Sequence, residues 1–297
     1  MAPTEALAST ALNIVSRVSG RLAGAGAYAL FHMPLARSRM RASERELCGT
    51  ADIQRLKVSG KEAVVYRWGD GERPVLLVHG WQSRGSRFAD FVPGLRERGY
   101  TVVTFDAPGH GDATGRSTTI QEYRHILTEL HGQYGDFEAV VAHSLGALGS
   151  VFSLQHGVRA KRLATISGVC DFAYLIEEFC SVVTLRPRLE ERLRDLVDEK
   201  LFSGLPAGER PFSAVNTVGA MDIPLLVVHD EDDPRIGIDQ GRRLAGAFGE
   251  SARLVVTHTL GHRRILGDPD VVRTVLDFVE HGPDRITDTR SGSTATQ

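Results

Sequence analysis

A serine between small residues follows a short apolar run near the middle of the chain. The run Ala139–Ala142 has the composition of a buried strand, and His143-Ser144-Leu145-Gly146 ends it just before residues that favour a helix. A corner this sharp strains its residue, so Ala142 and Gly146 must be small. The strain would lift the Ser144 hydroxyl clear of the sheet, above the first N–H groups of the helix. The pattern indicates a nucleophile, although a tight turn with a capping serine has the same residues.

Backbone N–H groups that could hold an oxyanion are expected beside this serine. The tripeptide His79-Gly80-Trp81 follows the apolar run 75–78, and its glycine would let the backbone turn so that the N–H of Trp81 faces Ser144. With the N–H of Leu145 it would form a hole with two donors. The alternative is a plain turn glycine beside a structural histidine, and we interpret His79 itself as structural.

Two later segments could supply an acid and a base. The cluster Asp230-Glu231-Asp232-Asp233-Pro234 follows the apolar run 225–228, and one of its carboxylates could orient an imidazole. In Leu260-Gly261-His262, after the last apolar run, the glycine would give His262 room to approach the serine. Nucleophile, acid and base in this chain order match one known lineage of triads. The residues thus predict acyl transfer through a covalent serine intermediate.

Strand and helix patterns alternate around these segments. Runs that are apolar at every position are typical of strands covered on both faces. Their alternation with helical patterns predicts an α/β fold, with a mostly parallel sheet between helices and working loops at the carboxyl ends of the strands. We expect strands at 75–78, 101–105, 139–142, 163–166, 225–228 and 254–257 after a strand pair at 52–58 and 63–68, and helices at 87–98, 120–134, 145–156, 239–248 and 269–279.

Three segments fall outside this alternation. Residues 1–50 are rich in Ala and Arg and predict a helical extension, which either packs over the catalytic domain or lies on lipid headgroups. Within the main domain, expected at 51–280, residues 170–218 predict a helical insert that covers the working face as a lid. A surface excursion without a role in binding is the alternative. The polar tail 281–297 is expected to be disordered.

Composition narrows the classes of partner and compartment. The 297 residues are 42% hydrophobic with a net charge of −2, which favours a soluble globular protein with a small-molecule substrate and argues against nucleic-acid binding. Three cysteines without a Cys-x-x-Cys pair suit a reducing compartment, so we expect a cytoplasmic protein. The sequence shows neither a signal peptide, nor an apolar run long enough to span a membrane, nor a metal-ligand spacing. We expect no metal and no cofactor, and nothing determines the oligomeric state.

Taken together, the motifs resemble those of the α/β-hydrolase superfamily, on its single-domain serine esterase and thioesterase side. The resemblance extends from about Val64 to Val279 and includes Asp106-Ala107-Pro108-Gly109-His110-Gly111. It implies the α/β-hydrolase fold with His262 as the base, and it implies Asp233 as the acid, with Asp230 as the fallback. Ala142 departs mildly from the family pattern, which usually has glycine there.

The resemblance implies hydrolysis of an ester or thioester with a small to medium apolar acyl group. Ser144, Asp233 and His262 would form the triad, and the N–H groups of Trp81 and Leu145 would hold the oxyanion. Acyl transfer to an alcohol or amine, cleavage of a C–C bond, and peptide hydrolysis could use the same residues. A ligand-binding protein on the same fold, without catalysis, is the remaining alternative.

Overall fold

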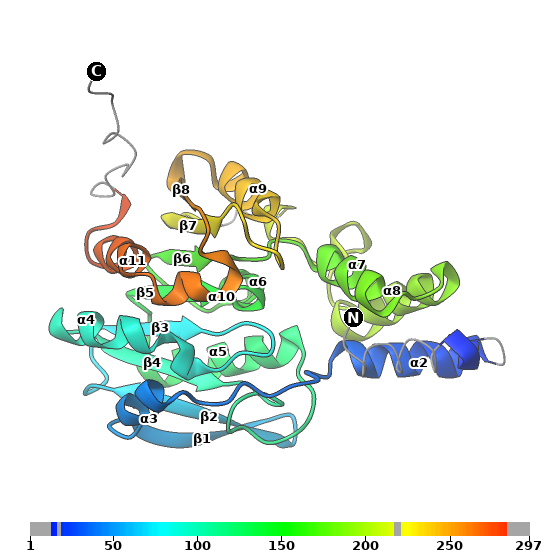
Figure 1. Cartoon of the computed structure of the whole chain (residues 1–297), viewed down its shortest axis with the longest axis horizontal. Helices are drawn as coiled ribbons and strands as arrows, with labels where there is room; N and C mark the ends of the chain where they lie inside the picture. Colours follow the sequence, from blue (N-terminus) through cyan, green and yellow to red (C-terminus); the bar gives the residue numbers. More distant parts are fainter. Residues whose placement is uncertain (1–12, 17–18, 217–220, 284–297) are drawn as a thin grey trace.

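The computed structural model describes residues 13–16, 19–216 and 221–283, and its centre is a single sheet (Figure 1). The strands are β1 (Asp52–Val58), β2 (Lys61–Trp68), β3 (Pro74–Val78), β4 (Thr101–Asp106), β5 (Ala139–His143), β6 (Leu163–Ile166), β7 (Leu225–Asp230) and β8 (Ala252–Thr257). They lie in the order β1-β2-β4-β3-β5-β6-β7-β8. β2 pairs antiparallel with β1 and with β4, and all the other pairs are parallel.

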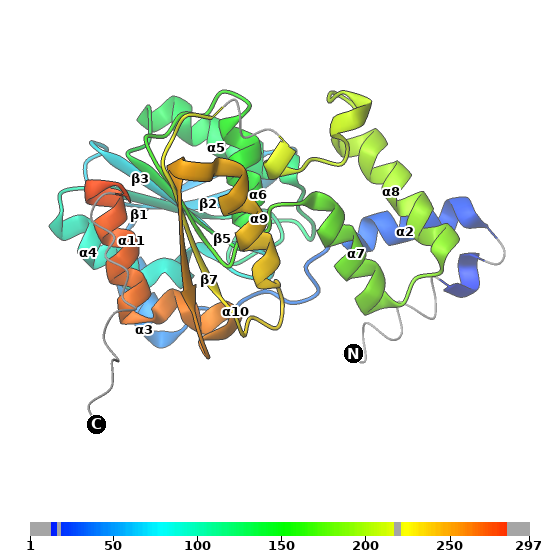
Figure 2. The same cartoon turned by 90° about the horizontal axis from the view of Figure 1, so that it is seen from above.

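Helices cover both faces of the sheet (Figure 2). The α-helices of the described residues include α2 (Gly20–Phe31), α3 (Ala42–Cys48), α4 (Val92–Glu97), α5 (Ile120–Tyr134), α6 (Leu145–Leu154), α7 (Phe172–Val183), α8 (Pro187–Leu201), α9 (Ile238–Phe248), α10 (Gly261–Arg264) and α11 (Pro269–His281). Successive residues of β3 enter opposite cores: Leu76 and Val78 pack with α5, α6 and α9, whereas Val75 and Leu77 pack with α4 and α11. Burial on both faces explains why the strand is apolar at every position.

The expected strands are all present, which confirms the α/β-hydrolase architecture, but two details differ. β8 is only half-buried along its length, because it lies at the edge of the sheet and has one neighbouring strand. The helix expected at 87–98 is a 3-10 segment, Gly85–Phe91, followed by the short α4. Proline lacks an N–H and is best tolerated in the first turn of a helix. This explains why α4 begins at Val92, with Pro93 in its first turn.

The helices α7 and α8 follow β6 and precede β7 in the chain. In space they pack with α2 at one end of the molecule (Figures 1 and 2). Small residues allow the close approach of α2 to α8: a Cβ at Gly24 would lie 2.6 Å from Cγ of Arg192. No helix in the described part of the chain has both the length and the apolarity to cross a bilayer. The division into extension, main domain and lid stays a prediction, and most of the tail expected to be disordered lies outside the described residues.

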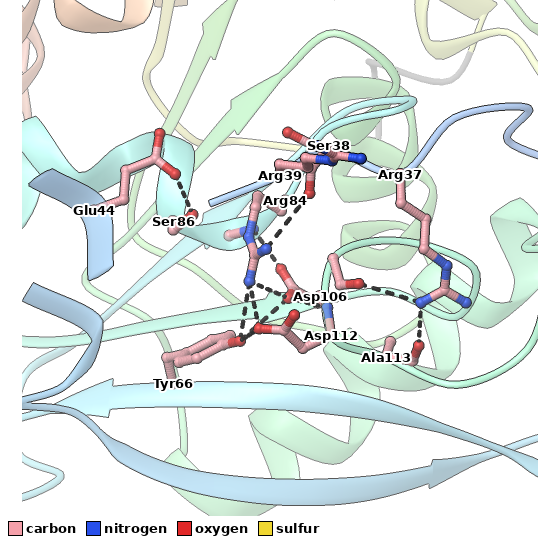
Figure 3. Close-up of polar contacts among 12 residues, drawn as sticks. Arg37, Ser38, Arg39, Glu44, Tyr66, Arg84, Ser86, Asp106, Asp112 and Ala113 are labelled. Carbon is pink, nitrogen blue, oxygen red and sulfur yellow. Dashed lines mark hydrogen bonds and ion pairs between the residues drawn. The ribbon is translucent and has the colours of Figure 1, made fainter. Parts of the chain in front are cut away.

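Asp106, at the end of β4, is the centre of a buried polar cluster (Figure 3). Its carboxylate accepts the N–H groups of Gly85 and Asp112, each at 2.8 Å, and lies 3.2 Å from the guanidinium of Arg84. A Cβ at Gly111 would come within 2.0 Å of this carboxylate, so only glycine fits. The cluster therefore joins the loop after β3 to the loop after β4.

Replacing Arg84 by methionine should destabilise the fold strongly. The side chains of Arg84 and Asp106 are 3% and 0% exposed, and removing one member of a buried pair leaves an uncompensated charge, at a cost of about 3–5 kcal/mol. Urea unfolding followed by circular dichroism measures the loss. Lys161→Met, which breaks the more exposed pair with Glu138, is the control and should cause a much smaller change. Equal losses in the two variants would contradict this role of Asp106.

Candidate active site

Ser144 occupies a strained corner between β5 and α6. Its backbone has φ 56° and ψ −124°, a left-handed region that residues with a side chain seldom adopt. Neighbouring backbones approach so closely that a Cβ at Gly146 would lie 2.4 Å from the Val78 carbonyl oxygen. A Cβ at Gly80 would lie 2.6 Å from Cβ of Ser144. The corner therefore requires glycine at both positions, whereas Ala142 fits within the buried strand.

The imidazole of His262 lies between Ser144 and an aspartate. Its Nε2 is 3.1 Å from Oγ of Ser144, and its Nδ1 is 2.8 Å from Oδ2 of Asp233. When the N–H at Nδ1 donates a hydrogen bond to the carboxylate, Nε2 keeps a lone pair and can accept the proton of the hydroxyl. The structure thus brings together three residues from the loops after β5, β7 and β8 in a hydrogen-bonded row. Their catalytic roles remain a prediction.

The acidic residues after β7 have different partners. Asp230 accepts the N–H groups of Leu260 and Gly261, at 3.1 and 2.9 Å, and the hydroxyl of Thr257 at 2.8 Å. It therefore anchors the loop that carries His262. Asp233 is the acid that contacts the imidazole. Glu231 and Asp232, which lie between Asp230 and Asp233 in the sequence, contact residues other than Ser144 and His262. Glu231 pairs with Arg242 and His258, and Asp232 accepts the N–H of Thr259.

Asp233 is held in its ionised form. Burial by itself raises the pKa of this carboxyl, but the hydrogen bond with His262 and the N–H groups of Arg235 and Ile236 outweigh that effect and lower the pKa to about 2. The carboxylate therefore carries its negative charge at all but strongly acidic pH. A negative charge beside Nδ1 stabilises the imidazolium that forms when His262 takes up a proton.

Three other histidines close to the site are buried and neutral. Burial lowers the pKa of His79 to about 4 and the pKa values of His110 and His143 to about 3. His79 accepts the N–H of Ala107 at 3.0 Å, which agrees with a structural role. The ring of His143 packs against the ring of His262, with centroids 4.7 Å apart, and its Nε2 donates to the carbonyl oxygen of His262 at 2.8 Å. Sequence reasoning missed this support for the base, and its only signal was adjacency to Ser144.

A cavity of about 300 Å³ opens above Ser144 and His262. Trp81 and Leu145 both line it, at the positions expected for oxyanion donors. Leu145 is the first residue of α6, where an N–H group has no partner within the helix. The Trp81 ring packs edge-on against His110, with ring centroids 5.3 Å apart. Binding of an oxyanion by these N–H groups stays a prediction.

The loops and helix ends of the main domain contribute Gln82, residues 118–120, Arg235, Ile236 and Arg263 to the cavity wall, and the rest of the wall comes from two segments outside the sheet. One is α7, and the other comprises residues 30–35 at the end of α2 and just beyond it. Most of their side chains that face the cavity are apolar or aromatic. Such walls are typical of pockets that bind a small apolar ligand. Within the described residues, no group of three or more His, Cys, Asp or Glu side chains has the arrangement of a metal site.

Comparison with known proteins assigns the chain to a family. The sequence profile of the alpha/beta hydrolase family matches residues 75–275, about two thirds of the chain. The chain belongs to this family. The matched region begins in β3 and ends within α11, so it contains Ser144, Asp233 and His262 together with both expected oxyanion donors.

Two relatives with assigned activities match across most of the family fold. A non-heme haloperoxidase of Rhodococcus erythropolis is 23% identical over 270 residues, covering 74% of this chain and 97% of that protein. A pimeloyl-[acyl-carrier protein] methyl ester esterase of Neisseria meningitidis is 26% identical over 252 residues, covering 72% of this chain and 95% of the esterase. In both alignments the relative is almost completely covered, and more than a quarter of this chain has no counterpart.

Solved structures share the fold at low sequence identity. An esterase of Pyrococcus furiosus has a TM-score of 0.60 at 18% identity, covering 84% of this chain and 97% of that chain. The thioesterase domain from the curacin biosynthetic pathway has a TM-score of 0.56 at 14% identity, covering 78% of this chain and 99% of that chain. At this level of identity the similarity establishes the fold alone.

Asp233 should contribute to stability only above strongly acidic pH. Because its folded pKa, about 2, lies below the unfolded value near 3.9, the stabilisation is present above pH ~4 and is lost as the pH falls toward 2. In this window the free energy of unfolding should fall less steeply for Asp233→Asn than for the wild type. Urea unfolding at a series of pH values measures both slopes. Equal slopes would contradict the lowered pKa.

Proposed function

We propose that this protein is a serine hydrolase that cleaves an ester or thioester of a small to medium apolar acyl group. The observation that carries the proposal is the position of His262, which lies within hydrogen-bonding distance of both Ser144 and Asp233. A histidine bridged in this way to a hydroxyl at a strained corner is the arrangement that nucleophilic acyl transfer requires. The apolar cavity beside Ser144 supports the class of acyl group.

The first half of the reaction would form an acyl-enzyme. Oγ of Ser144 attacks the carbonyl carbon of the substrate while Nε2 of His262 takes up the hydroxyl proton. The carbonyl oxygen becomes an oxyanion, which the N–H groups of Trp81 and Leu145 stabilise. When the tetrahedral intermediate collapses, the bond to the alkoxide or thiolate breaks, and His262 gives its proton to this leaving group.

The second half would return the enzyme to its starting state. Water donates a proton to Nε2 of His262 and attacks the acyl carbon, forming a second tetrahedral intermediate at the same donors. Collapse of this intermediate breaks the bond to Oγ of Ser144, His262 returns its proton to Oγ, and the carboxylic acid is released. Throughout, Asp233 remains ionised and keeps the imidazole in the tautomer that leaves Nε2 free to accept a proton.

A relative with an assigned activity favours an acyl substrate, since it is named as a methyl ester esterase. Transfer of the acyl group to an alcohol or amine would use the same intermediate, and it would be detected by analysing the products formed when such an acceptor competes with water.

Ser144→Ala should lower the rate of ester hydrolysis by several powers of ten, because the nucleophile is removed while the fold is retained. Release of nitrophenol from p-nitrophenyl butyrate measures the rate. Labelling with a fluorophosphonate, which reacts with an activated serine, should be lost in the same variant. A Ser144→Ala protein that hydrolyses the ester at the wild-type rate would refute the assignment.

The two candidate acids should respond differently to replacement. Asp233→Asn should lower kcat by about 10⁴-fold, because the amide favours the wrong tautomer of His262. Asp230→Asn should lower Tm more than Asp233→Asn does, because Asp230 accepts the N–H groups of Leu260 and Gly261, and it should reduce kcat less. Thermal unfolding and ester hydrolysis are measured on both variants. The reverse ranking of kcat would assign the acid to Asp230.

A further inference from the structure

Part of the wall of the active-site cavity comes from residues that lie outside the match to the family profile. Leu30, Phe31, His32, Met33 and Leu35 line the cavity, although the family profile begins only at residue 75. The two curated relatives cover 72–74% of this chain while being matched over almost their whole length. Residues 30–35 are therefore a feature of this chain that its matched core does not account for.

This wall is attached to the core on its C-terminal side. The carbonyl oxygen of His32 accepts the N–H of Thr118 at 2.9 Å. Arg37 donates to the carbonyl oxygens of Gly111 and Ala113, at 3.2 and 2.6 Å (Figure 3). Both contacts reach the loop between β4 and α5, which the buried Asp106 cluster holds in place. The position of the wall relative to Ser144 is therefore set by the core.

Further contacts tie the following residues to the segment after β3. Arg87 donates to Oγ of Ser38 at 2.7 Å and to the carbonyl oxygen of Arg39 at 2.9 Å. Arg87 also pairs with Glu44, which accepts the hydroxyl of Ser86 at 2.8 Å. Figure 3 shows the contact between Glu44 and Ser86, and separately those of Arg37 with the loop after β4. Residues 32–44 thus form a strap with contacts at both of its ends.

Phe31 is the residue of this wall that joins it to α7. Its ring packs edge-on against Phe172 and Phe179, with centroids 5.9 and 5.2 Å apart, and all three rings line the cavity. Edge-to-face contacts at these distances are favourable, so the ring has a defined position. The neighbouring His32 adds no charge near neutral pH, because burial lowers its pKa to about 4. Three aromatic rings in one part of the cavity wall suit contact with an apolar chain.

We propose that Phe31 sets the longest acyl chain that the cavity accepts, so that a segment outside the matched hydrolase core determines substrate specificity. This inference rests on the proposed function, in which the acyl group of an ester enters the cavity beside Ser144. The core supplies the reacting groups, and the strap supplies the boundary that an apolar chain meets. Phe31 would act by excluding methylene groups and would take no part in the chemistry.

The test is a series of p-nitrophenyl esters from acetate to laurate, assayed with the full chain. Phe31→Ala should extend the range to longer chains and raise kcat/KM by about tenfold or more for the first ester that the wild type rejects. Phe31→Trp should shorten the range. Identical chain-length profiles in all three proteins would overturn the proposal.

Leu22→Ala is the matched control, since Leu22 lies on the same helix, is 67% exposed and does not line the cavity. Its profile should match that of the wild type. Opposite shifts in Phe31→Ala and Phe31→Trp also exclude a general loss of folding, which would lower the rates for all esters in the same direction. A shift of the same size in Leu22→Ala would overturn the assignment to Phe31.

A binding measurement separates this inference from the proposed function. Trp81 lines the cavity, so its fluorescence should change when fatty acids from butyrate to laurate are titrated into the protein. If the wild type hydrolyses no ester, the proposed function fails, but Phe31→Ala should still bind longer fatty acids than the wild type does. Equal chain-length dependence of binding in the two proteins would overturn the inference, whether or not the protein is an esterase.

Discussion

The close approach of three backbones around Ser144 is the constraint on which the site depends. The corner between β5 and α6 lies so near the end of β3 that a Cβ cannot be accommodated at Gly80 or Gly146. This packing keeps Ser144 at a positive φ and turns its hydroxyl toward the cavity. β5 lies between two parallel strands, β3 and β6, so the corner at its carboxyl end is in the middle part of the sheet. The loops after β7 and β8 can reach it there.

Buried polar groups hold these loops in register. Asp230 binds the backbone of the loop that carries His262, and His143 binds the carbonyl oxygen of His262 itself. Asp106 connects the loops after β3 and β4 in the same way. Each of these side chains is almost fully buried, so the cost of leaving it without a partner favours one loop conformation over others.

The cavity combines parts with different origins in the chain. Ser144, His262 and α7 lie within the region that the family profile matches, whereas residues 30–35 lie outside it. Similarity to relatives therefore informs the chemistry at Ser144 more than the choice of substrate. The contacts of Arg37 and Thr118 show why the added wall can still be well placed: its anchors are backbone groups of the core loop after β4.

Sequence alone determined the strands and the candidate nucleophile, because these depend on local features. An apolar run followed by His-Ser-Leu-Gly specifies a buried strand and a sharp corner within a few residues. The half-burial of β8 was missed, since it depends on a sheet neighbour distant in the chain. The 3-10 segment before α4 was also missed, although Pro93 is a local signal that a helix begins there.

Only the tertiary structure decided which groups meet in space. It showed that Asp233 contacts His262 whereas Asp230 anchors the loop, and that residues 30–35 form part of the cavity. These facts arise from contacts between residues far apart in the sequence, and the local pattern of hydrophobic residues carries no information about such contacts.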